Sequence, residues 1–75
     1  MGAPKRVQIN GIWYTVRKPF NTWELYAGAD YPQYTMNEPY IHIRDFYWIY
    51  NSNGTQVGEI HTVNRTYSGC VQAFE

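Results

Sequence analysis

Alternation of apolar and polar residues is clearest near the beginning of the chain. Apolar side chains recur at every second position on both sides of Asn10-Gly11. Asn-Gly is the preferred central pair of a type I′ turn, because both of its residues adopt positive φ angles. The pattern therefore predicts a β-hairpin with a two-residue turn. Its register would pair Ile9 with Ile12, Val7 with Tyr14 and Lys5 with Val16 on one face, and Gln8 with Trp13 and Arg6 with Thr15 on the other.

A second hairpin is predicted in the second half of the chain. Residues 40–50 are rich in aromatic and β-branched residues, and the turn-forming run 51–54 separates them from a second β-favouring stretch over 55–63. Asp45 interrupts one face of the first strand, which predicts a bulge or bend near it. Gly58 is a candidate bulge in the second strand.

The register of this second hairpin stays open between a two-residue and a three-residue loop. With a three-residue loop His61 would lie opposite Asp45, and with a two-residue loop it would face Phe46. The inward face of the hairpin is open for the same reason. An aspartate beside His61 could tune the histidine as a general base. A histidine that is exposed, or buried with its hydrogen bonds satisfied, is however more common.

The segment between the hairpins gives weaker signals. Asn21 followed by Glu24 fits a capping box, which predicts a short helix over 21–28 that ends at a glycine. The alternative is a strand or irregular loop with Trp23 and Leu25 pointing inward. Residues 29–39 contain two prolines and are expected to form a loop.

A last short strand is predicted from about Cys70 to Phe74, where it could close an edge of the sheet. Together the elements give a mainly β fold, or a β-rich α+β fold, in the order β-β-(short α)-β-β-β. The architecture is a small antiparallel sheet or barrel in a single domain over residues 1–75. A barrel would also protect the edges of an aromatic sheet.

Composition adds a surplus of aromatic side chains to this picture. The 75 residues include three Trp, eight Tyr and three Phe, and one cysteine, so an internal disulfide is excluded. Each ring can bury roughly 150–250 Å² of surface. A domain of this size cannot enclose so many rings, so some are expected on the surface, where Tyr and Trp favour contact with a partner.

Candidate catalytic chemistry is weak. Cys70 is expected to be a small buried hydrophobe, and no arrangement of acids, of Ser and His, or of glycines marks a catalytic or phosphate-binding site. His42 and His61 do not form a metal cluster with the lone cysteine. We therefore expect a protein that is not an enzyme and that uses no cofactor or metal.

The favoured hypothesis is a protein-binding module, of the kind seen in inhibitors, adaptors and small viral accessory proteins. Its partner would be a larger protein, with a homodimer as the alternative that buries the same rings. The aromatic surplus is greatest in the expected loop and in the strand over 40–50. The candidate anchors are Tyr31, Tyr34, Tyr40, Trp48 and Tyr50.

The alternative hypothesis is binding of single-stranded nucleic acid by the first hairpin. Four cations and no acid occur in residues 1–18, although the formal net charge of the whole chain is zero. A ring flanked by cations suits single-stranded nucleic acid, because bases can stack on the ring and phosphates can pair with the cations. A chain of zero net charge is unusual for this function. The candidate residues are Arg6, Gln8, Trp13, Arg17 and Lys18.

A cytoplasmic setting is the expected location. The N-terminal residues include no apolar stretch typical of a secretory signal, and the sequence contains no apolar run of membrane-spanning length. A single cysteine is consistent with a reducing compartment.

Overall fold

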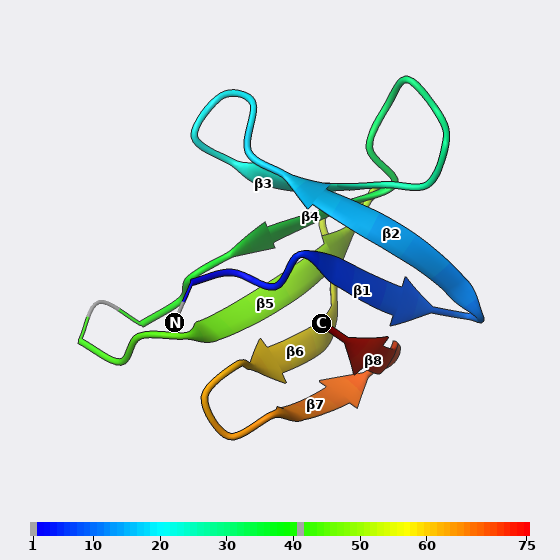
Figure 1. Ribbon diagram of the computed structural model, residues 1–75. Helices are drawn as coiled ribbons and strands as arrows, with labels where there is room; N and C mark the ends of the chain where they lie inside the picture. The colour runs from blue at the N-terminus through cyan, green and yellow to red at the C-terminus, as the bar shows by residue number, and fades with distance from the viewer. Residues whose placement is uncertain (1, 41) are drawn as a thin grey trace.

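The protein folds as one antiparallel β-sheet, seen in a computed structural model that describes residues 2–40 and 42–75 (Figure 1). Within these residues there are eight strands and no helix. The strands are β1 (Arg6–Ile9), β2 (Ile12–Arg17), β3 (Trp23–Tyr26), β4 (Tyr34–Asn37), β5 (Phe46–Asn51), β6 (Gln56–His61), β7 (Thr66–Gly69) and β8 (Val71–Phe74).

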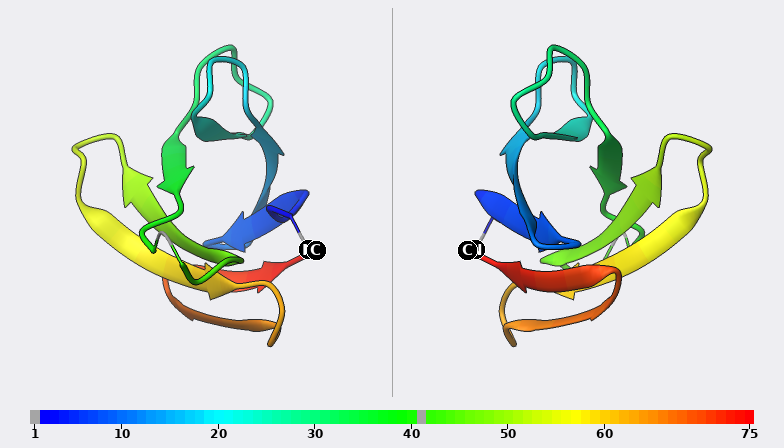
Figure 2. Two further views of the ribbon diagram at one scale, coloured as in Figure 1. Left: turned by 90° about the vertical axis from the view of Figure 1, so that its left-hand side faces the viewer. Right: turned by 90° about the vertical axis from the view of Figure 1, so that its right-hand side faces the viewer.

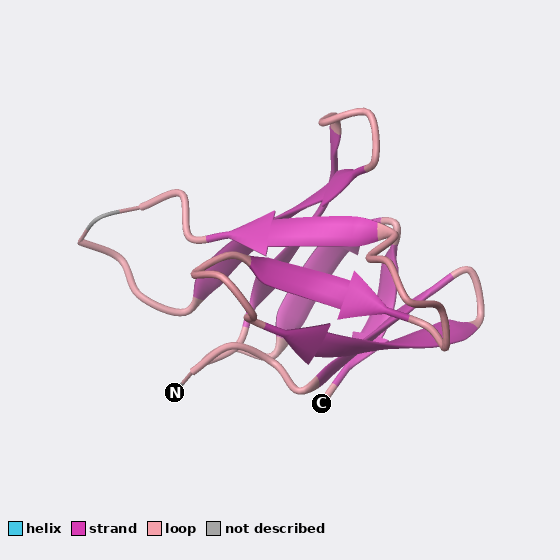
Figure 3. Cartoon of the chain, turned by 90° about the horizontal axis from the view of Figure 1, so that it is seen from above, coloured by secondary structure: helices cyan, strands magenta, loops and turns pink. Residues whose placement is uncertain are grey.

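The sheet curls into a nearly closed barrel (Figure 2). The strand order is β7-β6-β5-β4-β3-β2-β1-β8, so strands β1 to β7 form a meander and β8 returns to pair with β1. Seen from above, the described chain consists of strands joined by loops that project at the strand ends (Figure 3). The mainly β sheet or barrel predicted from the sequence is confirmed.

Inward-facing residues of seven strands form a single buried core. Each strand alternates between the two faces of the sheet, so every second residue reaches the interior. Burial of these side chains is the main source of stability for so small a barrel. The core residues are Val7, Ile9, Tyr14, Leu25, Met36, Tyr47, Ile49, Ile60 and Val71.

The N-terminal hairpin forms with the predicted register. β1 pairs with β2 through Ile9 and Ile12, Val7 and Tyr14, Gln8 and Trp13, and Arg6 and Thr15. Asn10 and Gly11 both have positive φ angles, of 53° and 78°. These are the angles that a type I′ turn requires at its two central residues.

The second hairpin is present, but its first strand is shorter than predicted. β5 begins at Phe46 rather than at residue 40, and residue 41 lies outside the described residues. Asp45, directly before β5, has a φ of 69°, so the expected bend near it is confirmed. The pairing of β5 with β6 shifts register between Ile49 and Tyr50. Next to the turn Tyr50 lies opposite Gln56, which is the offset expected for the three-residue loop. Val57 is then an extra residue in β6, directly before the candidate bulge Gly58, and beyond it His61 lies opposite Phe46 rather than Asp45.

The helix predicted over 21–28 is wrong. The segment contains strand β3, in which Leu25 points into the core, as the alternative interpretation required. Asn21 has a φ of 70°, whereas a helix N-cap has an extended backbone, so the capping box does not form. The residues before β3 instead make the loop of a β2–β3 hairpin, in which Arg17 pairs with Glu24.

The loop predicted over 29–39 is also wrong in part, because it contains β4. This strand pairs with β3 on one side and β5 on the other, and Met36 is buried in the core. The two prolines lie outside β4, where they remove no ladder hydrogen bond. Pairing with strands on both sides therefore makes residues 34–37 a strand, although their local sequence favours a loop.

The C-terminal strand is confirmed, and a further strand precedes it. β8 pairs with β1, so it closes an edge as expected. β7 was not predicted, because all four of its residues are exposed and it has no apolar alternation. Gly69 has a φ of 69° and lies against Val57, which lets the chain leave β7 sharply toward β8. The described part of the chain has no helix long and apolar enough to cross a membrane.

Candidate functional site

Four rings pack together on the outer face of the barrel over β5 and β6. Tyr40 contacts Phe46 and Trp48 edge to face, with ring centroids 5.5 and 5.9 Å apart. The imidazole of His61 stacks on Phe46 at 4.0 Å with an interplanar angle of 8°. We call these four residues the outer aromatic cluster.

The alternation of β5 explains why these rings lie outside the core. Tyr47 and Ile49 point inward and are buried, so Phe46 and Trp48 point outward. The indole Nε1 of Trp48 donates a 2.7 Å hydrogen bond to Oε2 of Glu59, its cross-strand partner on β6. This bond fixes the orientation of the indole on the surface.

The outer aromatic cluster is accessible and borders a shallow hollow. Tyr40 is 41% exposed, and the other three rings are half-buried. A hollow of about 140 Å³ lies between Phe46, Glu59 and His61 on one side and β7 on the other. The contacts among the rings restrict the rotamers open to each side chain.

The structure brings only part of the predicted protein-binding set together. Tyr40 and Trp48 are in the outer aromatic cluster, and Tyr50 lies farther along β5 on the same face. Tyr34 instead points inward and meets Tyr14 edge to face at 5.2 Å. Tyr31 is 64% exposed in the loop between β3 and β4, away from this cluster.

Sequence reasoning missed Phe46 and His61 as members of this surface. The signal was present in the alternation, since Phe46, Trp48 and Tyr50 share one face of the expected strand. The register decides that His61 completes the cluster, because it places the imidazole opposite Phe46.

The first hairpin gathers four of the five residues predicted to bind nucleic acid. Arg6, Gln8, Trp13 and Arg17 lie on the outer face of β1 and β2, which we call the basic–aromatic face. The guanidinium carbon of Arg6 lies 4.5 Å from the centroid of the Trp13 ring. Lys18 lies elsewhere, with its Nζ 4.0 Å from the centroid of the Trp23 ring.

Each arginine of the basic–aromatic face has a carboxylate residue beside it, as an ion-pair partner for Arg6 and as a cross-strand neighbour for Arg17. Arg6 forms a salt bridge with Glu75, including a 2.8 Å hydrogen bond from its Nε. Arg17 lies 5.4 Å from the Tyr26 ring and pairs across the strands with Glu24. The Tyr26 hydroxyl donates to Glu24, and this bond raises the pKa of the phenol. The face therefore carries two cations and two anions.

Cys70 is half-buried at the corner between β7 and β8 and packs against the core. Burial raises the pKa of its thiol, which lowers the thiolate fraction at neutral pH. Among the described residues, no three or more His, Cys, Asp or Glu side chains group together in a way that could hold a metal ion.

The fold and these surfaces define a small antiparallel β-barrel that presents aromatic side chains on its outer face. A comparison with protein-family models, with curated proteins and with solved structures gives no match to this chain.

Proposed function

We propose that this protein is a binding module that docks on another protein through the outer aromatic cluster. The observation that carries the proposal is the placement of Tyr40, Phe46, Trp48 and His61 outside a core that is already complete without them. Rings held rigidly on a surface are typical anchors of protein interfaces. The action on a larger partner would be that of an inhibitor or adaptor.

The surroundings of the cluster favour a protein over a nucleic acid as its partner. The polar groups that border it include Glu59 and, from β7, Thr66 and Ser68. A carboxylate beside the rings would repel phosphates, whereas peptide segments accept a mixed apolar and polar surface.

Crosslinking from the surface tests the proposal. A photoreactive phenylalanine at position 40 should crosslink one defined protein, and the same group at position 31 should not. Trp48→Ser should reduce this crosslink at least tenfold, because it removes a central anchor. The Arg6→Glu, Arg17→Glu double variant is the matched control on the opposite surface and should leave the crosslink intact.

Two outcomes would contradict the proposal. One is equal crosslinking from positions 40 and 31, and the other is full retention of the crosslink in the Trp48→Ser variant at unchanged thermal stability. If the crosslinked protein is a second copy of this chain, the cluster is a homodimer interface. Sedimentation equilibrium of the wild type would then show a dimer that the Trp48→Ser variant loses.

Single-stranded nucleic acid remains a second candidate because the basic–aromatic face brings together Arg6, Gln8, Trp13 and Arg17. Its weakness is the pairing of Arg6 with Glu75 and the position of Glu24 beside Arg17. A titration of tryptophan fluorescence with a mixed-sequence oligonucleotide at two salt concentrations tests it. Quenching that weakens steeply with salt and disappears in the double Arg variant would support this function. A flat titration would exclude it.

A further inference from the structure

A hollow of about 320 Å³ opens at the end of the barrel where β4 begins and β5 ends. Tyr34 and Asn51 pair across these two strands, and they lie on the inner face of the sheet, as does the buried pair of Met36 and Ile49 farther along the same ladder. The hollow is therefore at a mouth of the barrel, which is a common position for small-molecule sites. We call it the Tyr31 hollow, and its lining residues are Tyr31, Pro32, Gln33, Tyr34, Asn51 and Ser52.

The β3–β4 side of the Tyr31 hollow is held against the barrel. The backbone N–H of Gln33 donates a 3.0 Å hydrogen bond to the carbonyl oxygen of Leu25. The ring of Tyr34 meets that of Tyr14 edge to face, with centroids 5.2 Å apart. Pro32 restricts the backbone directly before these two anchored residues, because its ring fixes φ. A ligand would therefore meet a wall that is already in place.

Three polar side chains of the lining have hydrogen-bonding groups available to a ligand. Oδ1 of Asn51 accepts hydrogen bonds of 2.9 and 3.0 Å from the backbone N–H groups of Asn53 and Thr55, which fixes the orientation of the carboxamide. Its Nδ2 group has no acceptor in the described part of the chain, and the side chains of Gln33 and Ser52 likewise have no hydrogen-bond partner there. Two amides and one hydroxyl can both donate and accept, as a ligand with several hydroxyl groups requires.

Tyr31 adds an open aromatic ring to these polar groups. Its side chain is 64% exposed, and within residues 2–40 and 42–75 no other ring and no cation contacts it. The face of a phenol ring carries partial negative charge, so it attracts the C–H groups of a saturated ring that lies flat on it. The Tyr31 hollow thus combines one free ring face with free amide and hydroxyl groups.

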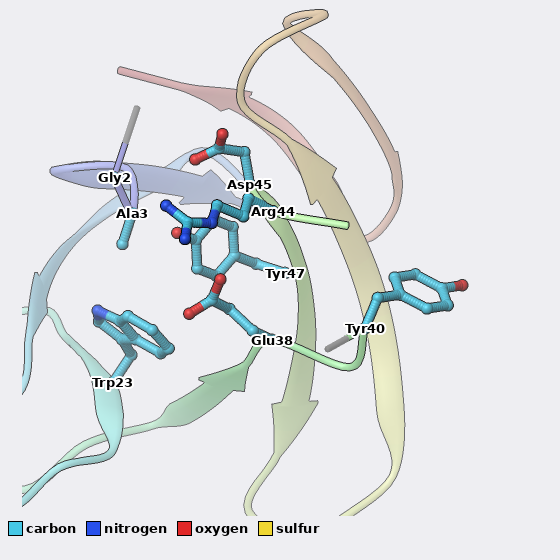
Figure 4. A pocket seen from close by; sticks show the side chains of 8 residues that line it. All are labelled: Gly2, Ala3, Trp23, Glu38, Tyr40, Arg44, Asp45 and Tyr47. Atoms are coloured by element: carbon cyan, nitrogen blue, oxygen red, sulfur yellow. The ribbon is translucent and has the colours of Figure 1, made fainter. Parts of the chain in front are cut away.

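The Tyr31 hollow differs from the larger pockets of the barrel in charge, because none of its six lining residues is charged. The pocket of about 500 Å³ beyond the other end of β4 is lined in part by Glu38, Arg44 and Asp45 (Figure 4). In the neutral hollow a charged ligand would lose hydration without gaining a counter-charge. A wholly apolar ligand would cover the amides and leave them unpaired. The lining therefore favours a neutral ligand that has both hydroxyl groups and an apolar face.

We propose that the Tyr31 hollow binds a neutral sugar in its ring form, either a free monosaccharide or a unit of a polysaccharide. One C–H face of the sugar stacks on Tyr31. The sugar hydroxyl groups accept from Nδ2 of Asn51 and exchange hydrogen bonds with Gln33 and Ser52. A proline-rich peptide fits less well, because such peptides dock in grooves lined by several open rings, whereas Tyr34 packs inward.

Proton–nitrogen correlation NMR tests this site directly, because the side-chain amides of Gln33 and Asn51 give signals of their own. The probes are the methyl pyranosides of glucose, galactose and mannose, together with sorbitol, which keeps the hydroxyl groups but has no ring. We expect saturable shifts of both amide signals with at least one pyranoside, and a Kd on the order of 1 mM because a single ring supplies the stacking. Sorbitol should bind at least about fivefold more weakly, because it offers no flat C–H face.

Variants of two lining residues make the result specific. Tyr31→Ala should weaken binding of the pyranoside at least about fivefold, whereas Tyr31→Phe keeps the ring and should change the affinity by less than about twofold. Gln33→Ala should weaken binding about two- to fivefold, because it removes a donor and an acceptor. Tyr40→Ala removes a ring from the outer aromatic cluster and is the matched control that should bind as the wild type does. The exposure of Tyr31 means that its substitution keeps the fold.

The ligands also separate the two sources of the sugar. Tighter binding of an oligosaccharide of the same sugar than of its methyl pyranoside indicates a polysaccharide, and the reverse indicates a free sugar. The proposal would be overturned by the absence of a saturable shift with all the pyranosides, by equal binding of sorbitol, or by unchanged binding in Tyr31→Ala. Saturable shifts with a polyproline peptide and with no sugar would overturn it in favour of a peptide site. The inference does not depend on the outer aromatic cluster, so its failure would leave the proposed function untouched.

Discussion

The rings of Tyr67 and Phe74 meet edge to face across the one gap in the barrel, with their centroids 6.3 Å apart. Tyr67 belongs to β7 and Phe74 to β8, which are the two edges of the sheet and share no ladder pairing. Both residues lie on the inner face, because they pair with the buried Ile60 and Val7. Side-chain packing therefore closes the barrel where hydrogen bonds do not.

The first prediction concerns this contact. Tyr67→Ala and Phe74→Ala should each lower the free energy of unfolding by about 1–3 kcal/mol, less than for fully buried rings because Tyr67 is 48% exposed. The double variant should reveal a coupling of about 0.5–1.5 kcal/mol in urea denaturation. Tyr31→Ala, a ring outside any described ring pair, should change the stability by less than about 0.5 kcal/mol. Additive effects of the two single variants would show that the rings do not close the barrel together.

The second prediction concerns the corner between β7 and β8. Gly69 has a φ of 69°, and a Cβ atom at this position would overlap the carbonyl oxygen of Val57. Gly54 has a similar φ of 82°, but a Cβ atom there would meet no described heavy atom within 4 Å. Gly54→Ala should therefore cost only the backbone penalty of about 1–2 kcal/mol, and Gly69→Ala clearly more.

Thermal or urea denaturation of the two glycine variants gives the answer. Equal losses of stability would mean that the backbone angle alone explains the glycine at position 69. A larger loss in Gly69→Ala would show that the close approach to β6 requires it.

The third prediction concerns alkaline pH. The pKa of Tyr47 is raised to about 12, chiefly by burial, above the value near 10 of an exposed phenol. The folded state thus holds the proton more tightly than the unfolded state. The resulting stabilisation is fully present below pH 10 and is lost as the pH rises from 10 through 12. Tyr47→Phe removes this titration, so its stability should fall less steeply over that range.

Absorbance at the tyrosinate band and urea denaturation across this pH range provide the measurement. Tyr31→Phe, which changes an exposed phenol, is the matched control and should retain the slope of the wild type. If Tyr47→Phe also retained that slope, another group would cause the alkaline loss of stability.

Two hairpins of this fold, β1–β2 and β5–β6, could be predicted from the sequence because short-range signals specify them. Asn10-Gly11 fixes both the turn and the register of β1 and β2. The strands β3 and β4 could not be predicted, because each has four residues and depends on pairing with its neighbours. The capping pattern at Asn21 and Glu24 was a competing local signal that tertiary pairing overrides.

The two candidate surfaces differ in the same way, since one depends on a short-range turn signal and the other on the pairing of strands. The basic–aromatic face follows from a hairpin whose register the turn dictates, so its residues could be grouped correctly. The outer aromatic cluster depends on the register of β5 against β6, which shifts between Ile49 and Tyr50. Loop composition alone could not reveal that Tyr34 would lie in β4 and point inward toward Tyr14.

The last prediction separates the stability of the outer aromatic cluster from its binding. Glu59→Ala leaves the indole N–H of Trp48 without its carboxylate acceptor and should lower the free energy of unfolding by about 1 kcal/mol, because the pair is only partly buried. Glu59→Gln keeps an acceptor at the same place and should cost less than half as much. Asp30→Ala removes an exposed carboxylate elsewhere and should be neutral. If Glu59→Ala matched Asp30→Ala in urea denaturation while the Trp48 indole signal kept its chemical shift, the hydrogen bond would not hold the ring in place, and the rigidity attributed to the cluster would have to come from ring contacts alone.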